Sequence, residues 1–285
     1  MRTRNHRGGP ARHWTLAATS TALLLPLAAC GEDAPSSPEG EAPSTSGDLP
    51  QGSDPVELEP SEFTAGSEHP YFPLESRRQW TYRETDTSGT TATVVVTVSS
   101  ETRQVANGVE ARIVRDTVTE DGELVEDTFD WYAQDADGNV WYLGEETAEF
   151  EEGKLATREG SFEAGADGAL PGVIMPADPA VGMEYRQEYY EGEAEDNGAV
   201  LALGQQADAP LGHFDDMLLT ADTNALEPDI LEYKLYAPDV GMVTALGISG
   251  GADREDLVST TMVSAATANA AGTVPLGKPY QGDGH

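Results

Sequence analysis

The sequence contains a single cysteine, Cys30, among 285 residues. One thiol cannot form a disulfide within the chain or a thiolate metal site, and no cysteine is left for nucleophilic catalysis in the body of the protein. Histidine is also scarce, with only His69, His213 and His285 beyond the N-terminal segment. None of them has a histidine or cysteine partner at zinc-binding spacing. We therefore expect no metal and no other cofactor.

Basic residues are few compared with acidic ones. The chain has 16 lysines and arginines against 51 aspartates and glutamates, which gives a formal charge of −35. Four of these arginines lie in the first twelve residues, so removal of a leader would leave 12 basic residues and a charge of −39. Such a surface repels nucleic acid and anionic headgroups. The composition excludes nucleic acid as a partner.

Long amphipathic helical patterns are missing, and the apolar residues recur with a period of two. Val94, Val96 and Val98 alternate with Thr93, Val95 and Thr97, and Asn-Gly or Asp-Gly pairs such as Asp121-Gly122 recur at intervals typical of hairpin turns. The pattern predicts an all-β fold, an antiparallel meander of about 10–12 strands forming a curled sheet, an open barrel or a sandwich. A meander is expected over residues 77–162, then a long loop at 164–182, then further strands up to residue 263.

The N-terminus has the order of an export signal. A positive segment without acids precedes an apolar run that is too short to span a bilayer. The run ends in Leu27-Ala28-Ala29-Cys30, which resembles the lipobox of bacterial lipoproteins. The resemblance implies that residues 1–29 are removed and that Cys30 carries lipid chains such as palmitate. The lipid membrane is then a partner, and the protein is anchored on the extracytoplasmic side of the cell membrane.

Three further segments follow from composition. Residues 30–66 are acidic and rich in Pro, Ser and Gly, which predicts a disordered linker after the lipidated cysteine. Residues 67–263 are long enough for a single β domain with a sizeable core. Residues 264–285 are rich in Ala, Gly and Thr, and we expect a flexible C-terminal tail.

The domain also carries a family resemblance. The stretch from Asp130 to Tyr142, which reads DWYAQDADGNVWY, and the later Asp239-Val240-Gly241-Met242-Val243 are similar to motifs of an uncharacterised family of exported bacterial β-proteins. These motifs carry no known chemistry. The strand succession is also similar to curled-sheet lipoproteins that carry lipids or lipoproteins on a concave apolar face.

The aromatic hairpin supplies the first candidate site. With Asp137-Gly138 as a two-residue turn, Tyr132 would lie opposite Leu143, and both faces of the hairpin would be aromatic. A second covered face indicates either a curled sheet enclosing a ligand or a sandwich with a loop packed outside. Aromatic residues in strands are also common in ordinary cores. The candidate ligand-face residues are Trp131, Tyr132, Trp141 and Tyr142.

A pair of acids supplies the second candidate site. With Asp121-Gly122 as a two-residue turn, Asp116 would lie opposite Asp127 on a partly apolar face. Two carboxylates in contact raise one pKa and could serve a hydrolase such as a glycosidase. A register slip of one residue removes the pair, and a solvated face would explain it equally well.

Two shorter motifs fail on closer inspection. The acids around Asp137 lack the glycine that a calcium-binding EF-hand loop requires at its sixth position, where Val140 stands. Residues 247–251 match the letters of the G-x-S-x-G nucleophile elbow, but a strand-like run follows them where that motif needs a helix. Both segments are interpreted as turns.

Two functions of different classes remain. The first is a non-enzymatic, membrane-anchored lipoprotein that binds an apolar ligand, a component of the cell envelope or a partner protein. The alternative is a secreted hydrolase that uses a carboxylate pair such as Asp116 and Asp127. Aromatic residues around an open cavity would favour binding, and acids converging in a polar groove would favour catalysis.

Overall fold

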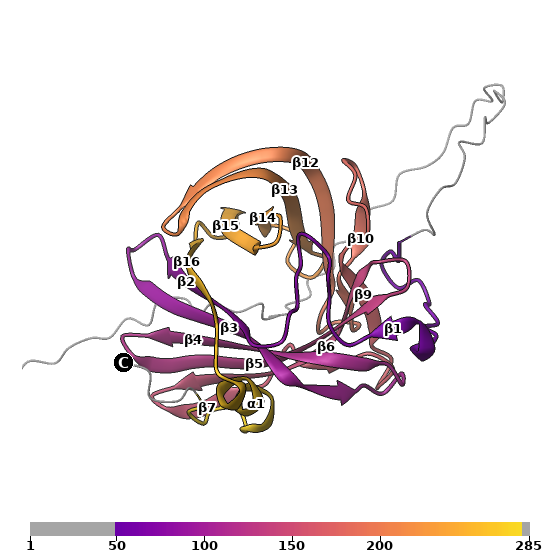
Figure 1. Ribbon diagram of the computed structural model, residues 1–285, viewed down its shortest axis with the longest axis horizontal. Coiled ribbons are helices and arrows are strands. Elements are labelled where there is room, and N and C mark those ends of the chain that lie inside the picture. Colours follow the sequence, from indigo (N-terminus) through magenta and orange to yellow (C-terminus); the bar gives the residue numbers. More distant parts are fainter. Residues whose placement is uncertain (1–48, 281–285) are drawn as a thin grey trace, which may run out of the picture.

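The computed structural model describes residues 49–280 (Figure 1). The expected signal peptide, Cys30 and part of the expected linker lie outside the described residues. Within them the chain forms sixteen strands, one 3-10 helix, η1 (Pro60–Glu62), and one α-helix, α1 (Ala265–Thr273). The strands are β1 (Phe63–Thr64), β2 (Arg78–Thr85), β3 (Thr91–Gln104), β4 (Glu110–Glu120), β5 (Glu123–Asp135), β6 (Val140–Glu151), β7 (Lys154–Thr157), β8 (Phe162–Glu163), β9 (Leu170–Met175), β10 (Glu184–Arg186), β11 (Glu188–Tyr189), β12 (Asp196–Ala209), β13 (Gly212–Asn224), β14 (Leu231–Ala237), β15 (Gly241–Ser249) and β16 (Arg254–Met262).

The strands form one antiparallel sheet that curls into a nearly closed barrel. Its order is β10-β12-β13-β14-β15-β16-β2-β3-β4-β5-β6-β9-β11, so most neighbours in the sheet are also neighbours in the chain. In Figure 1 the long β12 and β13 arch over the floor made by β3 to β6. The fold prediction of an all-β antiparallel meander is confirmed. One difference is β9, which lies inside the segment expected to be a loop.

The barrel has one seam where the continuous ladder is interrupted. The two end strands of the sheet, β10 and β11, are consecutive in the chain and separated only by Gln187. β10 pairs with β12, whereas β11 pairs with β9, so this segment crosses from one edge of the sheet to the other. The chain itself therefore bridges the seam at the point where it changes partner.

Arg186 holds this crossing together. Its side chain is fully buried and donates to the Pro171 carbonyl on β9 through both Nε and Nη2, at 3.1 and 2.7 Å. Its Nη1 donates to the carbonyls of Gly52 and Asp54, at 2.7 and 2.8 Å. The planar guanidinium thus joins three separate segments, which a single ammonium group could not do with the same geometry.

The described structure extends past the expected domain limits at both ends. Residues 49–66 pack on the barrel, and β1 pairs with the end of β5. Residues 65–77 then cross one mouth of the barrel, where the Tyr71 hydroxyl donates to the Asp216 carbonyl at 3.1 Å and the ring of Phe72 packs edge-on against Tyr132. Apolar residues such as Phe63 and Phe72 were too sparse in sequence to predict this packing.

At the other end, residues 265–280 cover part of the outer face of the sheet. Ser264 caps α1 by accepting from the Thr267 amide at 3.1 Å, and the helix places Ala268 and Ala271 against β3. The helix has nine residues and no amphipathic pattern, so small side chains that allow close approach are its only signal in the sequence. Gly272 lies so close to Ser99 that a Cβ there would meet its hydroxyl at 2.2 Å.

A buried ion pair attaches the C-terminal segment to the sheet. Arg115 and Asp127 are 0 and 1% exposed, and their two hydrogen bonds measure 2.7 and 2.5 Å. Arg115 also donates to the Val274 carbonyl, while Asp127 accepts from the Gly277 amide. The ring of Tyr280 covers the guanidinium at 4.2 Å. These partners satisfy both charges, which burial would otherwise make costly.

We expect Arg115→Ala to lower the free energy of unfolding by about 3–5 kcal/mol, because it leaves the Asp127 carboxylate buried without its counter-ion. The matched control is Arg158→Ala, which breaks the exposed pair with Glu146 and should cost less than about 1 kcal/mol. Urea denaturation of both variants measures the difference. Equal losses would show that burial does not set the strength of the Arg115 pair.

The seam gives a second prediction. A Cβ at Gly172 would lie 2.1 Å from the Gln187 carbonyl oxygen, so Gly172→Ala must push β9 away from the crossing segment. We expect a loss of about 1–3 kcal/mol in urea denaturation, as for other overpacked sites. Gly251→Ala meets only the end of the Asp253 side chain at 3.4 Å and should change stability little. A neutral Gly172→Ala would mean that the seam is not tightly packed.

Candidate functional site

The aromatic hairpin turns with a register different from the expected one. The Asp135 amide donates to the Asn139 carbonyl and the Gly138 amide to the Asp135 carbonyl, at 3.0 and 3.1 Å, so the loop has three residues with Gly138 at φ 101°. The Asp135 carboxylate stabilises this loop by accepting from the Asn139 amide at 2.8 Å and from the Trp141 indole at 2.7 Å. The expectation of a two-residue turn is wrong, and Tyr132 lies opposite Tyr142.

This register places the four aromatic candidates on two different faces. Tyr132 and Tyr142 stack with ring centroids 4.9 Å apart and face the interior of the barrel, which we call the lumen. Trp141 lies on the outer face, where Phe63 packs edge-on against it. Trp131 is 3% exposed because the guanidinium of Arg103 covers its ring at 3.9 Å. The structure therefore does not gather these four side chains into one ligand face.

The lumen is lined instead by acids and tyrosines. On β5 and β6, Asp130 lies opposite Glu145 because a bulge at Gly144 shifts the pairing by one residue. Gly144 has φ 133°, and a Cβ there would lie 2.4 Å from the Phe162 carbonyl oxygen, so the bulge requires glycine. Other acids reach the same space from β4, β11, β12 and β13. We call this group the lumenal cluster: Asp116, Asp130, Glu145, Glu188, Asp196 and Asp222.

One tyrosine links the first two acids. The Tyr142 hydroxyl lies 2.8 Å from Asp130 Oδ1 and 3.0 Å from Glu145 Oε2. A hydroxyl has only one proton to donate. When both contacts are hydrogen bonds, one of the two carboxyl groups must therefore carry a proton and donate it to the tyrosine.

The opposite wall holds the only cation that pairs with the cluster within the described residues. Lys234 Nζ on β14 lies 2.7 Å from Asp222 Oδ2 and 3.1 Å from Glu232 Oε2. Burial opposes its charge, yet these two acids raise the pKa of Lys234 well above its usual value. One ammonium cannot neutralise six carboxyl groups, so the cluster must hold protons, bind cations, or both.

Burial raises the pKa values of five cluster acids because it removes water from the carboxylates: Asp116, Asp130, Glu145, Glu188 and Asp196. The pKa of Asp130 rises to about 7, mainly through burial and also through the neighbouring Glu126. Burial followed by the charge of Asp130 raises the pKa of Glu145 and of Asp116 well above the usual range. Burial also raises the pKa of Glu188, which hydrogen-bonds to Asp196.

Solvent still reaches part of this interior. Asp116, Asp130, Tyr132 and Glu145 are half-buried, although each points inward from a wall of the barrel. Polar atoms are also left without partners there. Among residues 49–280, no hydrogen-bond partner is present for the buried Oδ1 atoms of Asp116 and Asp196 or for the Tyr185 hydroxyl. Buried groups of this kind are uncommon in folded proteins and mark a candidate site.

The predicted pair of Asp116 and Asp127 is not brought together. A bulge between Val118 and Thr119 shifts the register, so Asp116 lies opposite Thr128 and Asp127 opposite Thr117. The two carboxylates consequently point to opposite faces, with Asp127 bound to Arg115 under the C-terminal segment. Asp116 joins the lumenal cluster.

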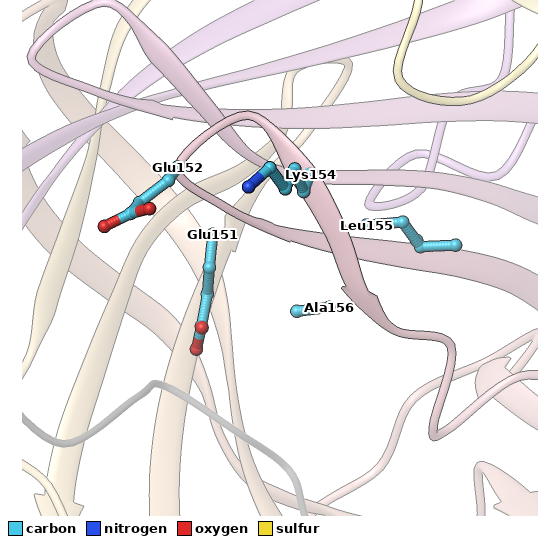
Figure 2. Close-up of a pocket in the computed structure, with 5 residues that line it drawn as sticks. All are labelled: Glu151, Glu152, Lys154, Leu155 and Ala156. Carbon is cyan, nitrogen blue, oxygen red and sulfur yellow. The ribbon is translucent and has the colours of Figure 1, made fainter.

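Depressions on the outer surface of residues 49–280 include the following two. The first, of about 350 Å³, surrounds the β6–β7 turn, where the side chains of Glu151, Glu152 and Leu155 are exposed and point in different directions (Figure 2). Such a turn offers no convergent groups. The second, of about 390 Å³, lies over β6 and β8 and is lined by Trp131, Phe162 and Glu145 among others. Since Glu145 also contacts Tyr142, this second depression adjoins the lumenal cluster.

The remaining motifs have structural roles. His69 is buried, with Nε2 3.0 Å from the Ala177 carbonyl, and His213 is an exposed partner of Asp208. Ser249 in the G-x-S-x-G match donates to the Asp229 carbonyl, and β16 follows it rather than a helix. No three His, Cys, Asp or Glu side chains between residues 49 and 280 are placed to hold a metal ion. Over the same residues, no helix combines the length and apolarity needed to cross a membrane.

Comparisons with known proteins give similarity to solved structures alone. No family model and no curated protein matches the chain, so the motif-based family resemblance stays a prediction. A candidate exported protein with a YmcC-like fold from Bacteroides fragilis is 14% identical, with a TM-score of 0.39 over 68% of this chain and 99% of that one. A candidate lipoprotein from Parabacteroides distasonis is 13% identical, with a TM-score of 0.37 over 70% of this chain and all of that one. A β-barrel-like domain of unknown function (DUF1849) from Brucella abortus is 13% identical, with a TM-score of 0.34 over 70% and 100%.

The raised pKa of Asp130 predicts an unusual dependence of stability on pH. Between about pH 4 and pH 7 the folded protein keeps a proton that the unfolded chain has released. The free energy of unfolding should therefore fall as pH rises through this window, by up to about 1.4 kcal/mol per pH unit for each such proton. Asp130→Asn should make this slope shallower.

Thermal and urea denaturation at intervals of half a pH unit measure the slope. Glu152→Gln, which changes an exposed carboxylate at the β6–β7 turn, serves as the control and should keep the wild-type slope. Identical slopes for wild type and Asp130→Asn would show that Asp130 ionises normally in the folded protein.

Proposed function

We propose that this protein is a non-enzymatic binding protein, held on the extracytoplasmic side of the cell membrane by a lipidated Cys30, with its ligand bound in the barrel lumen. The observation that carries the proposal is the lumenal cluster, a set of inward-facing polar groups that the protein's own side chains leave partly unsatisfied. Natural proteins usually keep such costly groups for function.

The lining groups favour a polar ligand over the apolar one expected from the sequence. Six carboxyl groups make up the cluster, two stacked tyrosines lie next to it, and the aliphatic residues of the inner face lie beside them. A lipid chain placed against buried carboxyl groups would gain no hydrogen bond from them. The ligand should therefore present hydrogen-bonding groups to Asp130 and Glu145.

Binding is also favoured over hydrolysis by the positions of the two acids on which the hydrolase alternative depended. A glycosidase needs two carboxyl groups across one cleft. Asp116 and Asp127 occupy opposite faces, and Asp127 is neutralised by Arg115. That pair supports no catalytic role.

Lumenal binding can be tested on the full-length lipoprotein. We expect a small molecule to co-purify with the protein extracted in mild detergent, and native mass spectrometry should detect the added mass. The variant carrying Asp130→Asn and Glu145→Gln should lose it, whereas Glu152→Gln should retain it. Loss from all three proteins, or retention by all three, would contradict binding in the lumen.

The anchor is tested separately. We expect Cys30→Ser to abolish labelling with palmitate and to move the protein from the membrane fraction to the soluble fraction, because stable anchoring depends on acyl chains. Western blotting of the two fractions measures the shift. An unlabelled wild-type protein, or a serine variant that stays membrane-bound, would contradict lipidation at this position.

A further inference from the structure

The lumenal cluster has an excess of acceptors over donors. Asp130 and Glu145 share a single tyrosine hydroxyl, and Asp222 takes one lysine that it shares with Glu232. Asp116 Oδ1 and Asp196 Oδ1 are buried without any donor among residues 49–280. A ligand that complements this lumen must bring donors and positive charge.

An independent observation comes from Tyr185. Its side chain is 1% exposed, its hydroxyl has no partner within the described residues, and its ring lies against Gly198. Gly198 is paired with Asp222, so the tyrosine lies next to the Lys234 side of the cluster. A buried hydroxyl left unsatisfied is destabilising, so its retention at this place points to a group that is supplied from outside.

We propose that the ligand of the lumen is a small organic cation with N–H donors, that is, a protonated primary or secondary amine, held by Asp130 and Glu145. The inference rests on the proposed function of lumenal binding and names the chemical class of the ligand. Ammonium N–H groups would supply the donors that the carboxylates lack, in charge-assisted hydrogen bonds. The faces of Tyr132 and Tyr142 add a surface on which a cation can rest.

The acids of the cluster belong to one space rather than to separate patches. Glu145 on β6 interacts with Asp196 on β12, and Tyr132 on β5 interacts with Lys234 on β14. Charge from both walls therefore acts on any group placed between them. A metal ion is a poorer fit, since no three acidic or histidine side chains in the described part of the chain converge at metal-binding distance.

A depression on the outer surface adjoins this space. Glu145 lines the depression over β6 and β8 as well as contacting Tyr142, and the acids Glu146, Glu163 and Asp167 surround the same depression. Negative charge around a surface depression raises the local concentration of cations there. Arg103, its one basic residue, is engaged with Glu163 and with the ring of Trp131.

Binding of an amine must release protons. A protonated carboxyl group of Asp130 or Glu145 loses its proton to solvent, and the resulting carboxylate then accepts an N–H of the ammonium group. The amine remains protonated throughout, and no other bond changes. Several titratable groups surround these carboxyls, and their charges act on the exchange: Asp116, Glu126, Tyr132, Tyr142, Glu188, Asp196 and Lys234.

Isothermal titration calorimetry of the full-length protein with putrescine tests the inference. We expect saturable binding whose measured enthalpy differs between phosphate and HEPES buffers, because released protons are taken up by the buffer. Affinity should fall as pH drops below 7, by up to tenfold per pH unit for each linked proton. The hexamethylated analogue of putrescine has the same charge without N–H donors and should bind at least tenfold more weakly.

Variants locate the site. Glu145→Gln and Asp130→Asn should each weaken putrescine binding about tenfold or more, while Glu152→Gln should bind as wild type does, with the fold of all three checked by circular dichroism. Equal affinity for both diamines, the same enthalpy in both buffers, or full binding by the lumenal variants would overturn the inference. If another molecule co-purifies and depends on Asp130 and Glu145 while putrescine does not bind, the lumen binds a ligand of another class and only the amine assignment fails.

Discussion

The sheet forms a barrel only if its two edges are held together, although no continuous ladder of backbone hydrogen bonds joins them. An open edge exposes unpaired amide and carbonyl groups and would let water enter the interior of the barrel. Here one short segment changes partner at Gln187, and the buried Arg186 fills the gap with four hydrogen bonds to carbonyl oxygens. Because all three acceptors are backbone carbonyls and none is a carboxylate, the guanidinium is stabilised by backbone dipoles from two segments at once, residues 52–54 and β9. The lumen exists as a separate environment only because this crossing holds.

Enclosure is what gives the inner acids their unusual properties. The same carboxyl groups on an open sheet would ionise freely and repel one another weakly through water. Inside the barrel, Asp130 and Glu145 lie on paired strands and share the hydroxyl of Tyr142, so their charges compete directly. The outer face differs, since there Asp127 forms a buried ion pair with Arg115 beneath the C-terminal segment. Two acids three residues apart on β5 thus have different roles because they face different sides.

Much of the architecture could be predicted from the sequence, because alternation of apolar residues and Asp-Gly turns reports strands directly. Val94, Val96 and Val98 face inward as their spacing indicates, and the meander was correctly anticipated. The candidate site could not be predicted in the same way, because single-residue bulges decide which side chains meet. The bulge at Gly144 brings Glu145 opposite Asp130, and the bulge after Val118 separates Asp116 from Asp127. The first bulge has only an isolated glycine inside a strand as its sequence signal, and the second, where Val125 is the extra residue, has none.

The place where the N-terminal segment joins the barrel has a mechanical consequence. The amide of Arg186 donates to the Pro50 carbonyl, and its side chain binds the carbonyls of Gly52 and Asp54, so residues 50–54 are fastened to the seam itself. Force applied along this end of the chain would act first on the seam between β10 and β11, before it acted on any of the long strand pairs. Such a force would tend to separate the two edges of the sheet and open the barrel. A force on residues 274–280 would instead be resisted by the Arg115–Asp127 ion pair beneath them.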